Sequence, residues 1–421
     1  MNMSHNDNGT GCAFELLGEQ VMACAAALAQ HTDSPGMMTR TYLTPAHHAA
    51  AAQLTRWMEE AGMAVRRDDA GNVIGRYEAA QPGAPALMTG SHFDTVRNGG
   101  IHDGMLGILL PLACVRRWHE QGRRFPFALE VVGFAEEEGV RFKATLLGSR
   151  AIAGTFDRAV LDNLDEQGVS MRAALAQAGF DADRLDRAAY APRSLLGFVE
   201  VHIEQGPVLL NEGLPVGVVS AISGASRFAV EVQGQAGHAG TVPMAGRRDA
   251  AMAAAEIGLF IERRCQDIPG LVGTVGQFHV PNGAANVVPG GAVFSIDIRA
   301  CDDADREGAV ADVLEAAQQI AARRQVGLTL RKTHEAPSVP CATGLQQQLA
   351  ASIERLNLPL RRLPSGAGHD AMAIAAISDV AMLFVRCGNG GISHSPDETM
   401  TAQDAAVAAR VFSDFVEHFS Y

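Results

Sequence analysis

Short apolar segments alternate with long helical stretches through most of this chain, and this alternation constrains the fold more than any other feature. The segments Ala86–Thr89, Leu129–Phe134 and Phe198–Ile203 are each bounded by turn residues, and the stretch Leu106–Glu120 has helical spacing. Strands that alternate with helices predict an α/β architecture. With 421 residues, the chain is too long for one compact core of usual size, so we expect two domains.

The pattern changes near residue 222. Phe228, Val230 and Val232 alternate with more polar neighbours, as in a half-exposed strand. A β-α-β-α-β order then covers about 110 residues, which predicts a small α+β domain with one helical layer. Residues 341–421 resume the α/β pattern and end in a helix over 402–419. We therefore predict that a domain of residues 222–336 is inserted into a domain formed by residues 1–221 and 337–421.

Composition narrows the possible partners and the compartment. The formal net charge is -13, and the 34 Lys and Arg residues form no long basic run, so a nucleic-acid partner is not expected. The seven cysteines include no C-x-x-C pair, which is typical of free thiols in a reducing compartment. The segment Met1–Gly11 lacks an apolar signal core, and no apolar run approaches the roughly 20 residues that cross a bilayer. These features predict a cytoplasmic protein with no membrane partner.

A histidine and two aspartates follow the first apolar segment. His92 and Asp94 have the His–x–Asp spacing that lets a metal-binding imidazole rest its second nitrogen on a carboxylate. Asp103 follows 11 residues after His92 in a glycine-flanked turn. Taken alone, the same pattern is equally consistent with a polar loop that carries an ordinary surface histidine.

Three adjacent acids, Glu136, Glu137 and Glu138, directly follow the second apolar segment. Three neighbouring carboxylates repel one another, and a bound cation would relieve that repulsion. A carboxylate that does not bind the cation could serve as a general base. Most glutamate runs are solvated loops, but this one begins where a buried strand is predicted to end. The residues alone do not distinguish the roles of the three acids.

Two further histidines complete the pattern. His202 lies in the third apolar segment with Glu200 and Glu204 on the same predicted strand face, and His394 lies in a turn-rich loop. A lone histidine in either place is more often structural than a ligand. Together, three histidines and two or three carboxylates near strand ends form the mixed nitrogen and oxygen set that suits Zn²⁺ or a similar ion. Two such ions can share one carboxylate.

The motifs H-x-D, D-G, E-E-E-G, H-I-E-Q-G-P and S-H-S-P-D-E, in this order, resemble the aminoacylase-type di-metal hydrolases of the peptidase M20 family. They are most similar to the ureidohydrolase branch, which contains allantoate amidohydrolases, N-carbamoyl-L-amino acid hydrolases and β-ureidopropionases. The resemblance extends from about residue 38 to the C-terminus. It implies a catalytic domain with a central mixed sheet flanked by helices, an inserted lid and dimerisation domain, and a homodimer. It also implies two divalent ions per subunit, Zn²⁺ or alternatively Mn²⁺, Co²⁺ or Ni²⁺.

The resemblance assigns roles to individual residues of this chain. His92 and His202 would bind one metal ion, Glu138 and His394 would bind the other, and Asp103 would bridge both. The implied catalytic residues are the general base Glu137, Asp94, which would orient His92, and His238, which would polarise the scissile carbonyl from the partner subunit. The implied substrate-binding residues are Gln205, His238, Asn286, Arg299, Gly368 and His369.

The implied reaction is hydrolysis of a ureido amide on a small carboxylate-bearing substrate. The stretches 38–43 and 134–142 look more like those of allantoate enzymes, which release ammonia and carbon dioxide in ureide catabolism, than like those of carbamoylases. An N-carbamoyl-L-amino acid hydrolase or a β-ureidopropionase is the alternative, and a dipeptidase comes third. A non-catalytic scaffold is the competing class, but it would need neither a full ligand set nor a base.

Overall fold

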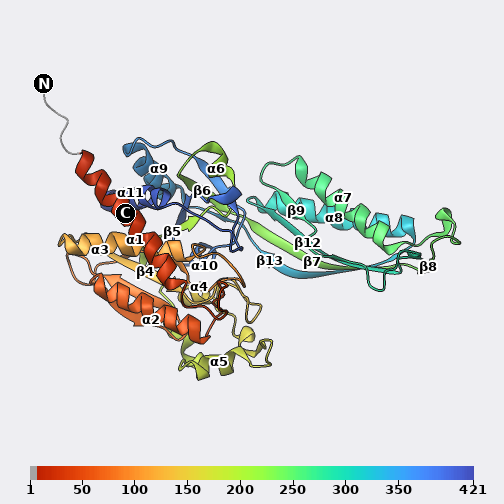
Figure 1. The fold of residues 1–421 in the computed structure, drawn as a ribbon, viewed down its shortest axis with the longest axis horizontal. Coiled ribbons are helices and arrows are strands. Elements are labelled where there is room, and N and C mark those ends of the chain that lie inside the picture. The colour runs from red at the N-terminus through yellow and green to blue at the C-terminus, as the bar shows by residue number, and fades with distance from the viewer. Residues whose placement is uncertain (1–6) are drawn as a thin grey trace. The chain divides into compact units, whose positions relative to one another are not determined.

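A computed structural model describes residues 7–421 and divides the chain into two compact units (Figure 1). Of the polar segment Met1–Gly11, residues 1–6 lie outside the described residues. Within the described residues, the first unit comprises 7–220, 341–363 and 369–421, and the second comprises 221–340 and 364–368. Residues 364–368 were not expected in the second unit. They are attached there by hydrogen bonds from Arg299 Nη1 to the Gly366 carbonyl, 2.7 Å, and from the Ser223 amide to the Ser365 carbonyl, 2.9 Å.

The first unit contains a mixed sheet in the strand order β1-β2-β4-β3-β5-β16-β6. The pairs β3–β4, β3–β5 and β5–β16 are parallel, and the other pairs are antiparallel. Every residue of β3, β4 and β16 is buried, which explains why these strands are mostly apolar, although β3 and β4 also bury Thr89, Ser91, His92 and Glu130. The strands are β1 (Ala64–Arg67), β2 (Val73–Tyr77), β3 (Ala86–His92), β4 (Ala128–Phe134), β5 (Leu195–Ile203), β6 (Val216–Ile222) and β16 (Val380–Val385).

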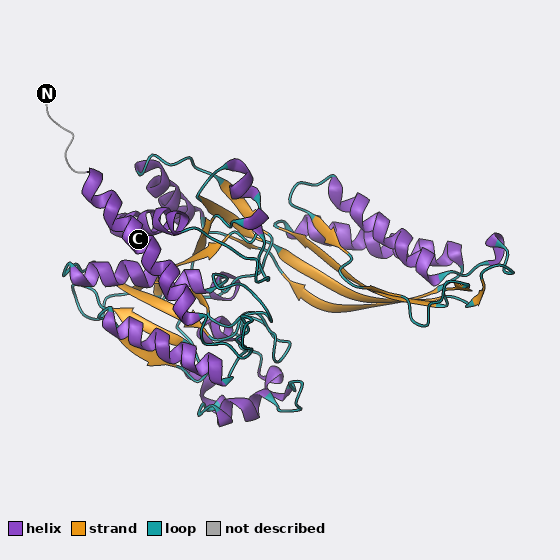
Figure 2. Cartoon of the chain, in the orientation of Figure 1, coloured by secondary structure: helices purple, strands orange, loops and turns teal. Residues whose placement is uncertain are grey.

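Helices pack against this sheet (Figure 2). Helix α3 contacts β3, β4 and β5, α9 and α11 contact β16, and α1 packs against α3 and α11. Thr44 starts α2 because its side chain accepts a hydrogen bond from the His47 amide and Pro45 occupies the first turn. The helices are α1 (Asp7–Leu28), α2 (Pro45–Glu60), α3 (Met105–Glu120), α4 (Leu147–Ala153), α5 (Met171–Gln177), α6 (Val208–Glu212), α9 (Thr343–Arg355), α10 (Ala371–Ile374) and α11 (Ala402–His418).

The second unit contains an antiparallel sheet in the order β10-β12-β7-β13, with β9 also paired to β12. Helices α7 (Ala250–Gln266) and α8 (Asp303–Arg324) pack on one face of the sheet, over a core that includes Val230, Val232 and Ile296. The strands are β7 (Gly224–Gln233), β9 (Val272–Thr274), β10 (Phe278–His279), β12 (Gly291–Ala300) and β13 (Gly327–Ala336), besides a two-stranded ribbon of β8 (Gly237–His238) and β11 (Val287–Val288).

These architectures confirm the predicted fold class: a mixed sheet with helices and a separate antiparallel sheet with one helical layer. The short strands β14 (Val339–Pro340) and β15 (Arg362–Ser365) lie where the chain passes from one unit to the other. Within residues 7–421, no helix is long and apolar enough to cross a membrane. The cysteines whose side chains are described are all free thiols, namely Cys24, Cys114, Cys265, Cys301, Cys341 and Cys387.

Candidate metal centre

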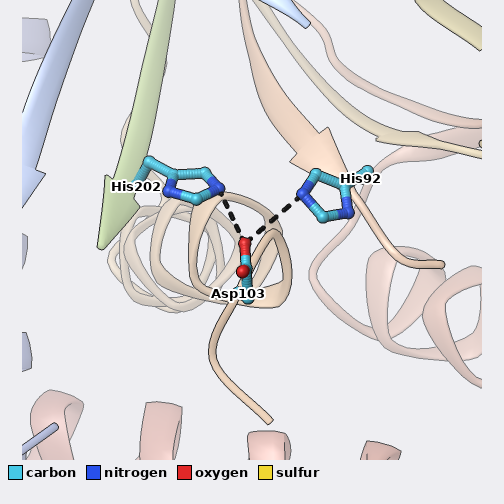
Figure 3. Close-up of side chains that lie close together, drawn as sticks. All are labelled: His92, Asp103 and His202. Atoms are coloured by element: carbon cyan, nitrogen blue, oxygen red, sulfur yellow. Dashed lines mark ion pairs between the residues drawn. The ribbon is translucent and has the colours of Figure 1, made fainter. Parts of the chain in front are cut away.

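The parallel strands β3 and β5 bring two predicted histidine ligands together at their carboxyl ends. His92 is the last residue of β3, and His202 is the last but one of β5. Their exposed fractions are only 3% and 1%, and their ring centroids are 5.9 Å apart. Both rings point toward Asp103, which precedes α3 (Figure 3).

Asp103 lies between two groups of potential ligands. Its Oδ1 is 3.6 Å from His92 Nε2 and 3.3 Å from His202 Nε2, while its Oδ2 is 3.3 Å from His394 Nε2. His394 Nε2 is in turn 3.5 Å from Glu138 Oε1. The structure therefore places all five predicted metal ligands in one cluster, with one oxygen of Asp103 directed to each half.

The donor set and its geometry fit two divalent ions. Two donors that each lie about 2.1 Å from a tetrahedral ion are separated by about 3.4 Å, which is close to the distances within each half of the cluster. Asp103 Oδ1 and His202 Nε2 are also buried and have no hydrogen-bond partner among the described residues. Imidazole nitrogens combined with carboxylate oxygens suit Zn²⁺ and similar ions, so the residues present could hold such a pair.

The electrostatics of the cluster favour cations. Burial, together with the negative charge of Asp103, raises the pKa of Glu138 to about 7. The hydrogen bond to Asp103 raises the pKa of His394 to about 9. Burial alone would raise the pKa of Asp103, but the adjacent imidazoles of His202, His394 and His92 hold it well below its usual range. A divalent cation would stabilise the ionised form of Glu138 and displace the histidine protons.

Asp94 connects His92 to the acidic loop. Its two carboxylate oxygens accept hydrogen bonds from the backbone amides of Glu137, 2.9 Å, and Glu138, 3.1 Å. Its Oδ1 is also 3.5 Å from His92 Nδ1. Asp94 thus contacts the predicted ligand His92, as expected, and also orients the loop that carries the predicted ligand Glu138, which was not expected.

The structure separates Glu136 from the other two acids, which the sequence left equivalent. Glu138 shares a ligand group with Asp103 and His394, and Glu137 lies beside His92 and Glu138. Glu136 is completely buried and belongs to none of the ligand groups found among the described residues. Desolvation raises the pKa of Glu137 well above its usual value, although the charge of His92 opposes that rise. Glu136 is thus set apart from its two neighbours, and the separate roles of Glu137 as base and Glu138 as ligand stay a prediction.

Glu398 supports the bridging aspartate, a contact that we did not predict. Its Oε1 accepts hydrogen bonds from the backbone amides of His102, 2.8 Å, and Asp103, 3.2 Å. A Cβ added at Gly100 would lie only 2.0 Å from Glu398 Cδ, so the carboxylate fills the space that this glycine leaves. Glu398 and His394 lie in the same loop. The loop that carries His394 therefore also fixes the backbone at Asp103.

Arg40 is a second support that sequence reasoning missed. It is completely buried, and its Nη1 donates to the Phe93 carbonyl, 2.9 Å, between His92 and Asp94. Its backbone exchanges hydrogen bonds with Thr95, from the Arg40 amide to Thr95 Oγ1 and from the Thr95 amide to the Arg40 carbonyl, each 2.9 Å. The only available signal was that Arg40 lies in the stretch 38–43, which resembles allantoate enzymes.

Two predicted substrate-binding residues lie at this centre. Gln205, in a left-handed backbone conformation with φ 56°, donates from Nε2 to Asp103 Oδ2 at 2.8 Å. The buried His369 ring lies 4.6 Å from the His202 ring, and burial lowers the pKa of His369 well below its usual value. His369 is therefore uncharged at neutral pH.

The other four predicted substrate-binding residues belong to the second unit. His238 lies on β8 opposite Val287 of β11, and the Ala239 amide donates to the Asn286 carbonyl at 2.9 Å. The exposed residues His238 and Asn286 thus share one ribbon. Arg299 lies near the far end of β12, and Gly368 is exposed in the segment 364–368.

Comparisons with known proteins agree with this geometry. The profile of peptidase family M20/M25/M40 matches residues 88–418. The chain is 38% identical to allantoate deiminase 1 of Glycine max, over 96% of this chain and 90% of that protein. It is 41% identical to an N-carbamoyl-L-amino acid amidohydrolase of Geobacillus stearothermophilus, over 89% and 92% respectively. The crystal structure of an amidase of the hydantoinase/carbamoylase family from Burkholderia multivorans matches with a TM-score of 0.88 and 31% identity, over 95% and 97%.

The arrangement predicts different outcomes for two neighbouring substitutions. Glu137→Gln should retain both metal ions but reduce turnover by about 10²–10⁴-fold, because it removes a base without removing a ligand. Glu138→Gln should weaken binding of the ion that Glu138 shares with His394. Metal content per subunit, measured by elemental analysis together with kcat, checks both. Loss of an ion from Glu137→Gln would show that the two roles are assigned to the wrong acids.

Proposed function

The chain belongs to peptidase family M20/M25/M40, in its allantoate deiminase and N-carbamoyl-L-amino acid amidohydrolase branch, and from that premise we propose that it hydrolyses allantoate. It is a metal-dependent amidohydrolase that acts on non-peptide carbon–nitrogen bonds. The observation that carries the proposal is the position of Asp103 between two ligand groups, with Glu137 beside them. This arrangement suits hydrolysis of an unreactive amide.

The proposed mechanism assigns a separate task to each group. When bound, two divalent ions would polarise the scissile carbonyl and lower the pKa of the attacking water. Glu137 accepts a proton from that water and returns it to the leaving nitrogen. His238 donates a hydrogen bond to the oxyanion that develops on the carbonyl oxygen. Zn²⁺ is the proposed ion, and Mn²⁺, Co²⁺ or Ni²⁺ are the alternatives that the same ligands accept.

Two observations favour a polar substrate such as allantoate. The second unit has a cavity of about 570 Å³ that is lined by Phe228, Val272 and Ile296 as well as by Thr274, Gln277, Ser295 and Arg299. The polar part of this lining could accept the second ureido arm of allantoate. The similarity to allantoate deiminase 1 also covers 96% of this chain, against 89% for the N-carbamoyl-L-amino acid amidohydrolase. The 41% identity to that amidohydrolase makes carbamoylase activity the second candidate.

Ammonia release from a panel of ureido acids tests the substrate. With metal-loaded enzyme, we expect kcat/KM for allantoate to exceed that for ureidoglycolate and for apolar N-carbamoyl-L-amino acids by on the order of tenfold or more. The reverse order would make the chain a carbamoylase. If no ureido acid is turned over by enzyme that contains both ions, the proposed activity is wrong.

Arg299 is proposed to bind the substrate carboxylate. A planar guanidinium can hold a carboxylate with two parallel hydrogen bonds, which an ammonium group cannot reproduce. Arg299→Lys should therefore cost about 1.5–3 kcal/mol on allantoate, the scale of a hydrogen bond to a charged group. For an analogue in which a neutral amide replaces the carboxylate, kcat/KM should fall little in this variant. We would measure kcat/KM for both compounds, and equal losses on both would exclude this role for Arg299.

A homodimer is supported by the length of the second unit. Arg299 lies eight residues along β12 from Gly291. Gly291 is the end of β12 that is next to the ribbon with His238. At about 3.3 Å per residue, the two ends are roughly 26 Å apart, farther than a small ureido acid extends. One copy of this unit thus cannot bring His238 and Arg299 to the same substrate, so we propose that His238 serves the partner's active site.

Mixed dimers test this arrangement. His238→Ala and Glu137→Gln should each be nearly inactive alone. A mixed dimer contains one complete site, in which the His238→Ala chain supplies Glu137 and the Glu137→Gln chain supplies His238. Co-expressed at equal levels with different tags, the two variants should recover about a quarter of wild-type activity, since half of the dimers are mixed and half of their sites are complete. Without recovery in dimers that carry both tags, His238 does not act across subunits.

The proposed location is the cytoplasm. The described cysteines are free thiols, which is typical of proteins from reducing compartments. The proposed partners are a small-molecule substrate and a second copy of the chain.

A further inference from the structure

The cavity in the second unit opens on the face of the sheet that lacks helices. Along β12, Phe294, Ile296 and Ile298 belong to the core beneath α7 and α8, and the intervening residues Asp297 and Arg299 line the cavity. Side chains alternate along a strand, so Asp297 and Arg299 lie on the same face.

Asp297 lies between two guanidinium groups. Arg299 Nε donates to Asp297 Oδ1 at 2.9 Å, and Arg299 Nη2 donates to Asp297 Oδ2 at 3.0 Å. From the neighbouring strand β7, Arg227 Nε donates to Asp297 Oδ2 at 2.9 Å. Arg227 is directly opposite Asp297 in the strand register, so the sheet itself sets this contact. The carboxylate thus receives hydrogen bonds on both oxygens.

These contacts determine which part of Arg299 can bind another anion. The Nε edge of its guanidinium is occupied by Asp297, and Nη1 donates to the Gly366 carbonyl at 2.7 Å. Three of the five N–H donors are therefore engaged, and one remains on each terminal nitrogen. A substrate carboxylate that meets Arg299 would meet these terminal nitrogens, while Asp297 holds the other edge.

The charges are compatible with binding an anion. Two arginines and one aspartate leave a net positive charge of about one in the cavity. Desolvation would raise the pKa of Asp297, but the hydrogen bond and charge of Arg299 and the charge of Arg227 hold it below its usual range. Asp297 therefore stays ionised at neutral pH. Arg227 remains 44% exposed, so it offsets the charge of Asp297 without being sequestered from solvent.

We propose that Asp297, held by Arg227, is a positioning residue that fixes the guanidinium of Arg299 for the substrate carboxylate. This inference rests on the proposed function, because it requires that Arg299 bind that carboxylate. A flexible arginine must be ordered on binding, and the pair with Asp297 orders it beforehand. Partly exposed ion pairs contribute little to folding stability, so the effect on substrate binding should be separable from any effect on the fold.

Asp297→Asn is the main test. The side chain keeps its shape but loses its charge, and one of its two acceptor oxygens is replaced by an NH₂ group that faces a donor of Arg299. We expect KM for allantoate to rise on the order of tenfold, with kcat changed much less, because the loss falls on the orientation of a binding group. The neutral-amide analogue should be hydrolysed as by the wild type, since it does not need an oriented guanidinium. Asp297→Glu, which restores the charge, should recover part of the affinity.

Two further variants complete the design. Arg227→Gln should raise KM for allantoate in the same direction but by a smaller factor, because it loosens Asp297 without removing it. Arg331→Gln is the matched control. Arg331 is an exposed arginine on β13, opposite Ala229 of β7, so this substitution removes the same charge from the same sheet. It should leave kcat and KM unchanged for both allantoate and the neutral-amide analogue. Thermal unfolding of each variant verifies the fold, and Arg227→Gln carries the test if Asp297→Asn does not fold.

The outcomes separate this inference from the function on which it rests. Suppose that Arg299→Lys impairs hydrolysis of allantoate but not of the amide analogue, while Asp297→Asn and Arg227→Gln show no such difference. The positioning role is then overturned and the carboxylate site stands. If Arg299→Lys itself harms both substrates equally, the carboxylate assignment fails and the positioning role fails with it. An equal rise in KM for allantoate in Arg331→Gln and Arg227→Gln would show that only the net charge matters, and this would also overturn the proposal.

Discussion

The structure of the metal centre depends on one buried carboxylate, that of Asp103. Three histidine nitrogens lie within 3.6 Å of its two oxygens, and these histidines come from two parallel strands and a distant loop. Burying a charge is costly unless it is paired, so the fold must deliver these partners. The parallel order β3–β5 does so for His92 and His202, because it places both carboxyl ends at the same edge.

The loops around Asp103 are held by other carboxylates rather than by apolar packing alone. Asp94 accepts from the amides of Glu137 and Glu138, and Glu398 accepts from the amides of His102 and Asp103. Hydrogen bonds to ionised acceptors are stronger than neutral ones and restrict the backbone on which the ligands sit. Such supports matter for a metal centre, because ligands displaced by a fraction of an ångström bind their ion less well.

Local patterns in the sequence were sufficient for much of the fold, whereas the predicted ligand roles came from the resemblance to a family. The apolar run before His92 marks a strand buried on both faces, and the run Phe228, Val230, Val232 marks one buried on a single face. The contacts of Glu398 and Arg40 were not predictable in this way, since each joins segments far apart in the chain. Glu398 is 295 residues from Asp103, and no periodicity reports such a pairing. Nor does any local pattern reveal that residues 364–368 join the second unit.

In the proposed function, the two units have different roles, and the structure of each unit supports its role. His92, His202 and Asp103 are buried where the ends of parallel strands converge, whereas the side chain of His394 is 50% exposed. The proposed recognition of the substrate carboxylate needs an accessible arginine, and Arg299 on the open face of the antiparallel sheet keeps 27% of its side chain exposed. The same sheet carries the ribbon of His238 at its opposite end. In the proposed arrangement, a rigid sheet with Arg299 and His238 at opposite ends would supply these two groups to different active sites in a symmetric pair of chains.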